Sequence, residues 1–186
     1  PGMPFKYTPD CDNMWVDIAR RTGSARLVYF RPENSDLTER FELRLRKAFL
    51  ARGVPFDEHV SFIPFLSRAH FFGLMKHAKL FLDSPGFSGF NTVMQAMECG
   101  LPVVTFDGAY LRGRLGSGIL RRIGMDSLIA NSNEAYADLV ANLMRNDEQR
   151  KRAQLQIIDQ RPLLFGDREP IAALERFFEE GAKWSG

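Results

Sequence analysis

The sequence has only two cysteines, Cys11 and Cys99, among 186 residues. Two thiols are too few for a disulfide framework, so we expect both to be reduced, as in a cytoplasmic protein. The charge is nearly balanced, with 25 Lys and Arg against 23 Asp and Glu. A net charge of +2 does not favour nucleic acid or a membrane surface as a partner. No apolar run approaches the roughly 18 residues that a membrane-spanning helix requires.

Several catalytic motifs are also missing. The chain has no P-loop, no Gly-x-Gly-x-x-Gly fingerprint and no Gly-x-Ser-x-Gly elbow, which argues against nucleoside triphosphate hydrolysis and hydride transfer. His70 and His77 lie seven residues apart without a carboxylate partner or zinc spacing, so we expect no metal site. The opening residues Pro-Gly-Met-Pro-Phe contain neither an initiator Met nor a signal-peptide pattern. We therefore expect a piece of a longer protein.

What the sequence does contain is a regular alternation of short apolar runs and amphipathic stretches. The apolar runs predict strands at residues 26–30, 60–65, 79–82, 102–106 and 127–130. The amphipathic stretches predict helices at residues 10–21, 36–52, 67–78, 91–99, 112–123, 131–145, 147–160 and 169–183. Alternating strands and helices predict a single α/β domain, residues 1–186, with a Rossmann-like, doubly wound parallel sheet.

The most informative segment is residues 79–108, KLFLDSPGFSGFNTVMQAMECGLPVVTFDG. A buried strand leads into a loop of Gly, Pro and Ser, and a short helix that Asn91 or Thr92 could cap follows. A second buried strand comes after Gly100. This order places a helix N-terminus at the carboxyl ends of parallel strands, where phosphates bind. A capped turn without any ligand fits the same pattern.

Two other groups accompany this segment. Arg68 and His70 follow another predicted strand-to-helix junction with Ser67 as the expected N-cap. Arg68 could contact a base, a ribose or a phosphate, whereas His70 either touches ligand or is merely packed or solvated. Arg114 follows the strand 102–106 on the expected ligand side. We expect Arg121 and Arg122, two turns later, to be solvated.

Asp83 and Asp107 each follow an apolar strand, so both could face the same cleft. One interpretation makes them an acid/base pair. The other makes each of them a cap for a loop or a helix.

The segment LFLDSPGFSGFNTVMQAMECGLPVVTFDG, followed by RGRLGSGILRRIGMDSLIANSNEAY, resembles the C-terminal catalytic half of the O-linked N-acetylglucosamine transferase (SPINDLY-like) glycosyltransferases. The resemblance extends to FKYTPDCDNMW near the start and QRPLLFGDREPIAALERFF near the end. It implies one half of a GT-B glycosyltransferase, which pairs two Rossmann-like domains. The upstream half, and possible helical repeats before it, would lie outside this chain.

The resemblance also implies roles for individual residues. Lys6 would meet the donor's diphosphate together with the backbone of Asn91 and Thr92. Arg68 would lie near the uridine, and Leu66 would offer a backbone contact to the base.

The sequence departs from the family pattern in this loop and at two helical positions. The loop reads Gly89-Phe90-Asn91-Thr92 where the family has Gly-His-Thr-Thr, and Gln95 replaces an Asp that meets the ribose. A helical histidine of the family aligns with Phe71, and the adjacent His70 could substitute for it. The predicted donor-binding residues are therefore Lys6, Leu66, Arg68, His70, Gly89, Phe90, Asn91, Thr92, Gln95 and Arg114.

The function implied is a UDP-sugar donor-binding domain of a protein glycosyltransferase, which transfers N-acetylglucosamine or a hexose to protein side chains. The diphosphate charge would be met by Lys6 and a helix N-terminus without a metal. No catalytic residue is expected within this chain, which should be inactive alone. One alternative is a non-catalytic regulatory or scaffolding domain with an eroded nucleotide site. Another alternative is a nucleotide-sugar epimerase, which would need Asp83 and Asp107 as a pair.

Overall fold

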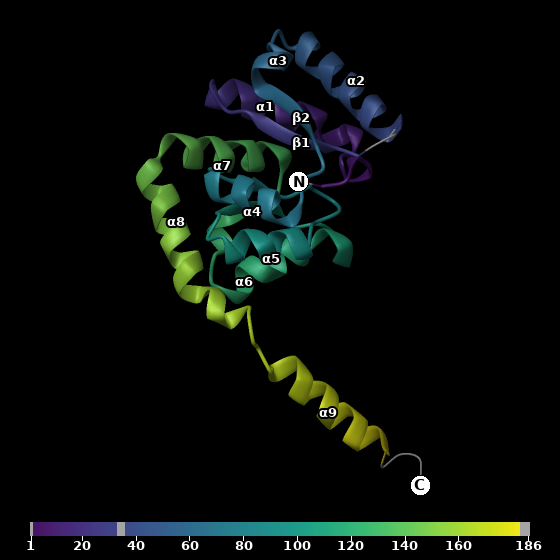
Figure 1. Ribbon diagram of the computed structural model, residues 1–186, viewed down its shortest axis with the longest axis vertical. Coiled ribbons are helices and arrows are strands. Elements are labelled where there is room, and N and C mark those ends of the chain that lie inside the picture. Colours follow the sequence, from purple (N-terminus) through teal and green to yellow (C-terminus); the bar gives the residue numbers. More distant parts are fainter. Residues whose placement is uncertain (1, 33–35, 183–186) are drawn as a thin grey trace.

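The computed structural model describes residues 2–32 and 36–182, and it is a parallel α/β structure (Figure 1). Its strands are β1 (Leu27–Arg31), β2 (Val60–Pro64), β3 (Phe81–Leu82), β4 (Val103–Phe106) and β5 (Ile129–Ala130). Its α-helices are α1 (Asp12–Thr22), α2 (Asp36–Ala51), α3 (Phe56–His59), α4 (Arg68–His77), α5 (Asn91–Glu98), α6 (Leu115–Arg122), α7 (Asn133–Arg145), α8 (Asp147–Gln160) and α9 (Glu169–Ala182). Short 3-10 turns join them at Pro4–Lys6, Pro9–Cys11, Leu111–Gly113, Asp126–Leu128 and Arg161–Leu163.

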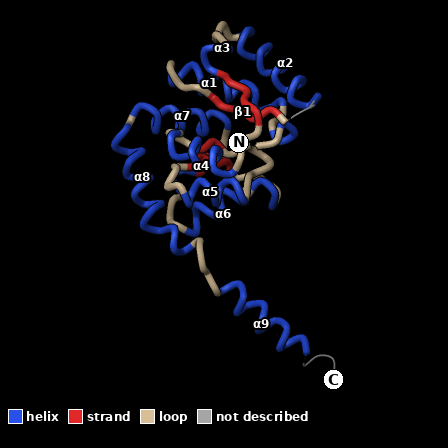
Figure 2. The backbone as a smooth tube through the Cα atoms, in the orientation of Figure 1, coloured by secondary structure: helices blue, strands red, loops and turns tan. Residues whose placement is uncertain are grey.

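All strand pairs among the described residues are parallel. β1 pairs with β2, with Leu27 opposite Val60. β4 lies between β3 and β5, with Phe81 opposite Val103 and Thr105 opposite Ile129. The parallel α/β architecture predicted from the sequence is therefore confirmed. The single continuous sheet is not, because the described strands form one sheet of two strands and another of three (Figure 2).

The strand β4 is buried on both faces. Helix α7 packs on it, as do α5 and α6, and Val103, Val104 and Thr105 are fully buried. A parallel strand covered on both faces needs apolar residues at every position rather than at alternate ones. This explains why the sequence 102–106 reads as a continuous apolar run.

Several element boundaries differ from the predicted ones. The helix predicted at 112–123 is a 3-10 turn followed by α6, because the backbone of Arg114 leaves the helical region (φ −114°, ψ 2°). The strands predicted at 79–82 and 127–130 are each only two residues long. The predicted end of the last helix, Lys183, lies outside the described residues.

An aromatic cluster joins the N-terminal segment to α1, β1 and α2. Tyr7 stacks on Phe41 with ring centroids 4.8 Å apart, and it meets the edges of Trp15 and Tyr29. Arg44 of α2 adds hydrogen bonds to the Tyr7 carbonyl at 2.5 Å and to the Asp12 carboxylate at 2.6 Å. These contacts fix the position of the segment that carries Lys6.

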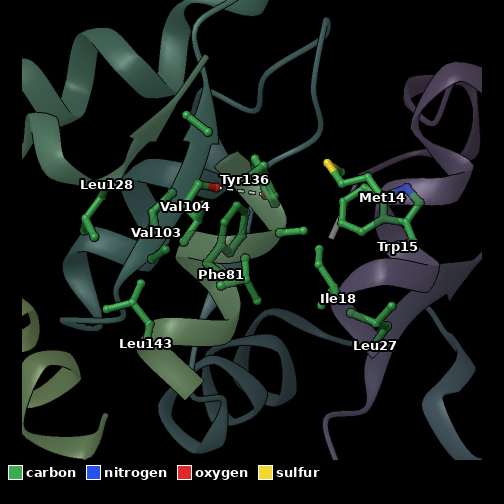
Figure 3. Close-up of a cluster of buried hydrophobic side chains, with 14 of the residues drawn as sticks. Met14, Trp15, Ile18, Leu27, Phe81, Val103, Val104, Leu128, Tyr136 and Leu143 are labelled. Atoms are coloured by element: carbon green, nitrogen blue, oxygen red, sulfur yellow. Dashed lines mark hydrogen bonds between the residues drawn. The ribbon is translucent and has the colours of Figure 1, made fainter. Parts of the chain in front are cut away.

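A second part of the core lies around β3 and β4. Figure 3 shows Phe81, Val103, Val104 and Tyr136 together, with the side chains of α1 and β1 on the other side of the view. The buried Tyr136 hydroxyl donates to the carbonyls of Asp83 at 2.8 Å and Val104 at 3.0 Å. Helix α7 is thereby tied to the carboxyl ends of β3 and β4.

Helix α9 extends away from the rest of the chain (Figure 1). Ile171, Leu174, Phe177 and Phe178 are exposed on it. None of the described helices combines the length and the apolar character needed to cross a membrane.

Replacing Leu45 on α2 tests the core that supports the N-terminal segment. Leu45 is 0% exposed and Leu43 on the same helix is 57% exposed. We expect Leu45→Ala to lower the free energy of unfolding by about 2–5 kcal/mol, because it leaves a cavity. Leu43→Ala is the matched control and should change it by less than about 0.5 kcal/mol. Urea denaturation followed by circular dichroism measures both, and equal effects would contradict the packing described.

Candidate functional site

The site is organised by Asp83, which directly follows β3 and is 2% exposed. Its carboxylate accepts hydrogen bonds from the Gly89 N–H at 2.8 Å, the Ser88 hydroxyl at 2.5 Å and the Thr105 hydroxyl at 2.8 Å. The Ser84 N–H donates to it at 3.1 Å. One buried carboxylate therefore fixes both ends of the loop 84–89 and joins that loop to β4.

The start of α6 packs against the same carboxylate. The Gly116 N–H donates to Ser88 Oγ at 2.7 Å. A β-carbon at Gly116 would lie 2.5 Å from Asp83 Oδ2 and 2.7 Å from Thr105 Oγ1, so only glycine fits. Burial raises the pKa of Asp83, and the hydrogen bonds from Gly89, Ser88 and Thr105 oppose that shift.

Asp107 is also engaged, at the loop after β4. It accepts from the Ser117 hydroxyl at 2.7 Å and forms an ion pair with Arg121 at 2.7 Å. The Arg121 hydrogen bonds, with help from Ser117, lower the pKa of Asp107 to about 2. Asp83 and Asp107 thus each serve their own loop, which supports the capping interpretation over an acid/base pair.

The arginines expected to be merely solvated also have partners. Arg121 and Arg122 are roughly half exposed, but Arg121 binds Asp107 and Arg122 binds Asp167 at 3.0 Å. An ion pair requires a carboxylate nearby in space, and Asp167 lies 45 residues further along the chain. Local spacing around these arginines does not reveal that partner.

Helix α5 begins without a side-chain cap. Phe90 occupies the N-cap position, and the first helical hydrogen bond runs from the Met94 N–H to the Phe90 carbonyl at 2.9 Å. The prediction that Asn91 or Thr92 caps this helix is wrong, because both residues lie within its first turn and Phe90, which has no side-chain acceptor, occupies the N-cap position. Among the described residues, no acceptor meets the N–H groups of Asn91, Thr92 or Val93. These donors and the positive end of the helix dipole remain available to an anion.

Lys6 lies next to this helix start, 82 residues from Ser88 in the sequence. Its Nζ donates to the Ser88 carbonyl at 3.3 Å and lies 4.5 Å from the centroid of the Phe87 ring. Partial burial lowers the pKa of Lys6, and the nearby Asp83 carboxylate opposes that shift. The fold therefore brings two elements of the predicted site, Lys6 and the loop before α5, together.

Only a small hollow of about 10 Å³ lies between these elements, and Lys6, Gly89 and Thr92 are among its lining residues. It has room for about one water molecule. Phe90 and Asn91, which lie in sequence between the lining residues Gly89 and Thr92, are exposed. An anion would therefore bind on the surface of the α5 N-terminus rather than inside a closed pocket.

The residues predicted near the nucleoside lie at the start of α4. Ser67 is the N-cap, as predicted: its Oγ accepts from the His70 N–H at 3.4 Å and lies 3.1 Å from His70 Nδ1. The Arg68 guanidinium lies 5.5 Å from the centroid of the Phe72 ring. In the described structure no hydrogen bond, ion pair or ring contact links Leu66, Arg68 or His70 to Lys6 or to α5. They follow the carboxyl end of β2, whereas Lys6 contacts the loop that follows β3.

Of the remaining predicted residues, Arg114 has a hydrogen-bond partner and Gln95 has none among the described residues. Arg114 Nε donates to the Gly108 carbonyl at 2.6 Å and so holds its own loop. Gly108 and Gly113 approach closely there, since a β-carbon at Gly108 would lie 2.9 Å from Gly113 Cα. Gln95 is half-buried one turn along α5, and its side chain has no hydrogen-bond partner among the described residues.

Within residues 2–32 and 36–182, no group of His, Cys, Asp and Glu side chains is arranged to hold a metal ion.

The sequence interpretation missed the hydrogen-bond network around Asp83. Its partners Ser88, Thr105 and Gly116 come from three separate elements. One signal was present: Thr105 is a lone hydroxyl in an otherwise apolar strand that is buried on both faces. A buried hydroxyl needs a hydrogen-bond partner, and Asp83 is the acidic residue that follows the neighbouring strand.

A helix N-terminus and a lysine lie together at the carboxyl ends of parallel strands, an arrangement in which α/β domains commonly bind anionic groups. A family model described as glycosyl transferase family 41 matches residues 3–168. The chain therefore belongs to glycosyl transferase family 41, the O-GlcNAc transferase family.

A solved structure of a mutant O-GlcNAc transferase from Thermobaculum terrenum is similar, with 24% identity and a TM-score of 0.79. The match covers 94% of this chain and 34% of that one. The similarity confirms the predicted fold class, one part of a GT-B glycosyltransferase. The chain spans about a third of the length of this relative.

The Asp83 network predicts opposite effects at two glycines of α6. Gly116→Ala forces a methyl group onto Asp83 and Thr105, and we expect it to lower the free energy of unfolding by at least about 2 kcal/mol. A β-carbon added at Gly118 would meet nothing within 4 Å beyond the backbone of its own helix. Gly118→Ala should therefore raise stability by up to about 1 kcal/mol through helix propensity. Thermal and urea unfolding compare the two, and a neutral Gly116→Ala would contradict the network.

The ion pair at Asp107 predicts an unusual titration. Because Arg121 lowers the pKa of Asp107 from 3.8 to about 2, its stabilisation is present above about pH 4 and is lost as pH falls through about 2. We expect Arg121→Gln to return the pKa of Asp107 towards its ordinary value. Arg122→Gln, which removes a neighbouring charge that binds Asp167 instead, should leave it unchanged. NMR titration of the carboxyl carbon measures the pKa, and equal values in wild type and Arg121→Gln would refute the assignment.

Proposed function

We propose that this chain is the donor-binding half of a protein glycosyltransferase that uses a UDP-sugar. The observation that carries the proposal is the pairing of Lys6 with the uncapped N-terminus of α5. Three backbone N–H groups without acceptors among the described residues, and one ammonium group, lie around the loop that Asp83 holds in place. Such a set of donors fits the diphosphate of a nucleotide sugar.

The same donors suit the chemistry of sugar transfer. When the bond between the sugar and the diphosphate breaks, negative charge develops on the departing UDP. Donors that are already in place stabilise that charge without reorganisation. The α5 dipole and Lys6 supply this stabilisation, so we propose that no metal ion is needed.

The nucleoside would extend from α5 towards the start of α4. Arg68 and the backbone of Leu66 would meet the base, with His70 beside them. Gln95 would hydrogen-bond a ribose hydroxyl, and Arg114 would border the site through the loop it holds. The neutral Gln95 and the exposed Phe90 would alter which sugar is accepted, so we propose transfer of either N-acetylglucosamine or a hexose.

The rest of the active site would come from outside this chain. We propose that residues 1–186 form one domain, and that an upstream α/β half supplies the acceptor-protein site and any general base. This fits the relative's greater length. The isolated chain would then bind the donor weakly and transfer no sugar.

A regulatory or scaffolding role is the second candidate. Its support is that Phe90 is 53% exposed at the N-cap of α5 and that the hollow beside Lys6 holds only about 10 Å³. A nucleotide-sugar epimerase finds no support, because Asp83 accepts hydrogen bonds from its own loop and Asp107 is held by Ser117 and Arg121 of α6.

Substitution of Lys6 tests the proposed site. We expect UDP to bind wild type in calorimetry, and Lys6→Gln to weaken binding about tenfold or more, since a charge-assisted hydrogen bond contributes about 1.5–3 kcal/mol. Lys47→Gln removes an exposed lysine of α2 and should leave affinity unchanged. Equal affinity of the Lys6→Gln variant and wild type would place the anion elsewhere.

An assay of the full-length protein with UDP-N-acetylglucosamine, UDP-glucose and a protein acceptor distinguishes the proposed glycosyltransferase from the regulatory alternative. Transfer of either sugar supports the proposal. No UDP binding at millimolar concentration, together with no transfer by the full-length protein, would favour the regulatory role.

A further inference from the structure

The loop that precedes α5 carries a partly exposed aromatic ring, Phe87, beside Lys6. Phe87 is 37% exposed, although its side chain is large and apolar. Two consecutive residues of the N-terminal segment contact this ring. The Phe5 ring lies 5.7 Å away between centroids with the planes tilted by 54°, and the Lys6 ammonium lies 4.5 Å from the centroid. The ring therefore joins the segment that carries Lys6 to the loop that leads into α5.

The backbone on both sides of Phe87 is held in place. Gly86, directly before it, has a φ of +77°, in the left-handed region that favours glycine. The Ser84 hydroxyl donates to the Phe87 carbonyl at 2.9 Å. The next N–H, that of Ser88, donates to the Arg112 carbonyl at 2.8 Å. The ring thus projects from a loop whose backbone is already ordered.

The ring supplements a weak hydrogen bond of the Lys6 ammonium. An ammonium carries three N–H donors at the end of a flexible four-carbon chain. Its hydrogen bond to the Ser88 carbonyl is 3.3 Å long, beyond the usual range of about 2.7–3.2 Å. Within the described residues, Lys6 forms no ion pair with a carboxylate. The contact with the Phe87 face is therefore a substantial part of what orders this ammonium.

An aromatic face suits this task because of its charge distribution. The negative face of the ring attracts the ammonium, but it carries no formal charge that would compete with an anion. A carboxylate in the same place would hold Lys6 and neutralise it. The ring therefore leaves the positive charge of Lys6, and its remaining N–H groups, available to a diphosphate.

Ordering the ammonium before the anion arrives favours binding. A lysine side chain loses much conformational entropy when it is immobilised. An ammonium that already lies beside the start of α5 loses less of it on binding. The apparent affinity falls in proportion to the fraction of molecules in which the group is correctly placed.

We propose that Phe87 is a positioning residue, whose ring face holds the Lys6 ammonium beside the N-terminus of α5. The inference rests on the proposed function, since it concerns how Lys6 meets the diphosphate of the donor. Phe87 acts through Lys6 rather than on the donor itself. Phe5 packs against the same ring and keeps it in place.

A double-mutant cycle on the full-length protein tests this proposal, with UDP affinity measured by calorimetry. Phe87→Leu keeps an apolar side chain but removes the ring. We expect it to weaken UDP binding about two- to fivefold, as the loss of a cation–π contact at a partly exposed site does. In a Lys6→Gln background the same substitution should change the affinity by less than about 1.5-fold, because the group it acts through is absent. Phe87→Tyr keeps the ring face and should stay within about twofold of wild type.

Phe165→Leu is the matched control, since Phe165 is 41% exposed and lies in the segment that joins α8 to α9. It should leave UDP affinity unchanged. An unchanged affinity of Phe87→Leu, or an equal weakening in both backgrounds, would overturn the proposal. If Lys6→Gln alone leaves the affinity unchanged, the proposed diphosphate site fails and this inference fails with it. If Lys6→Gln weakens binding without any coupling to Phe87, the inference alone fails.

NMR of the unliganded wild-type protein gives a second measurement, which does not require a Phe87 variant to fold. Protons that lie over an aromatic ring resonate upfield. With lysines ¹³C-labelled at Cε, and Lys6 assigned by the signal that Lys6→Gln removes, we expect its Hε resonance upfield of those of the other lysines. Phe87→Tyr should keep this shift and Phe87→Leu should abolish it. A Lys6 Hε resonance at the ordinary position in wild type would overturn the proposal by itself.

Discussion

The acceptance of four hydrogen bonds by the buried Asp83 carboxylate is the interaction on which the candidate site depends. It fixes the loop before α5 and joins that loop to β4 and, through Ser88, to α6. A buried carboxylate is costly unless donors surround it, and here two hydroxyls and two backbone N–H groups do so. The first N–H groups of α5 itself have no acceptors in the described part of the chain, because Phe90 at the N-cap has no side-chain acceptor. The carboxylate therefore holds in place the loop that leads into the proposed anion site.

Lys6 is held at this site by a different set of contacts, those of its neighbour Tyr7. Tyr7 is packed among Trp15, Tyr29 and Phe41, and Arg44 binds its carbonyl. The position of one lysine thus depends on the aromatic cluster that joins α1, β1 and α2.

Much of the fold followed from the sequence. The alternation of apolar runs and amphipathic stretches predicted every described strand and most helices, because covered parallel strands are apolar at each position. The loop at residues 83–92, leading from a strand to a helix N-terminus, was also predicted, since Gly and Ser cluster there. The Ser67 cap was predicted correctly because a cap depends on residues only three positions apart.

Features that depend on contacts between distant residues were not predicted. The pairing of Asp107 with Arg121 and of Arg122 with Asp167 depends on loop geometry that local spacing does not contain. The cap of α5 was predicted wrongly because the helix begins one residue earlier than a cap at Asn91 requires, with Phe90 at the N-cap position. The division of the sheet could not be seen either, because β1 and β3 each read as ordinary buried strands.

The central claim is that the N-terminus of α5 and Lys6 form a diphosphate-binding surface. Titration of the ¹⁵N-labelled protein with UDP, followed at each backbone amide, tests it most directly. We expect the largest shift changes at the amides of Asn91, Thr92 and Val93, with Lys6 and Phe87 affected next. Changes confined to the exposed face of α9, with none at the start of α5, would contradict the claim.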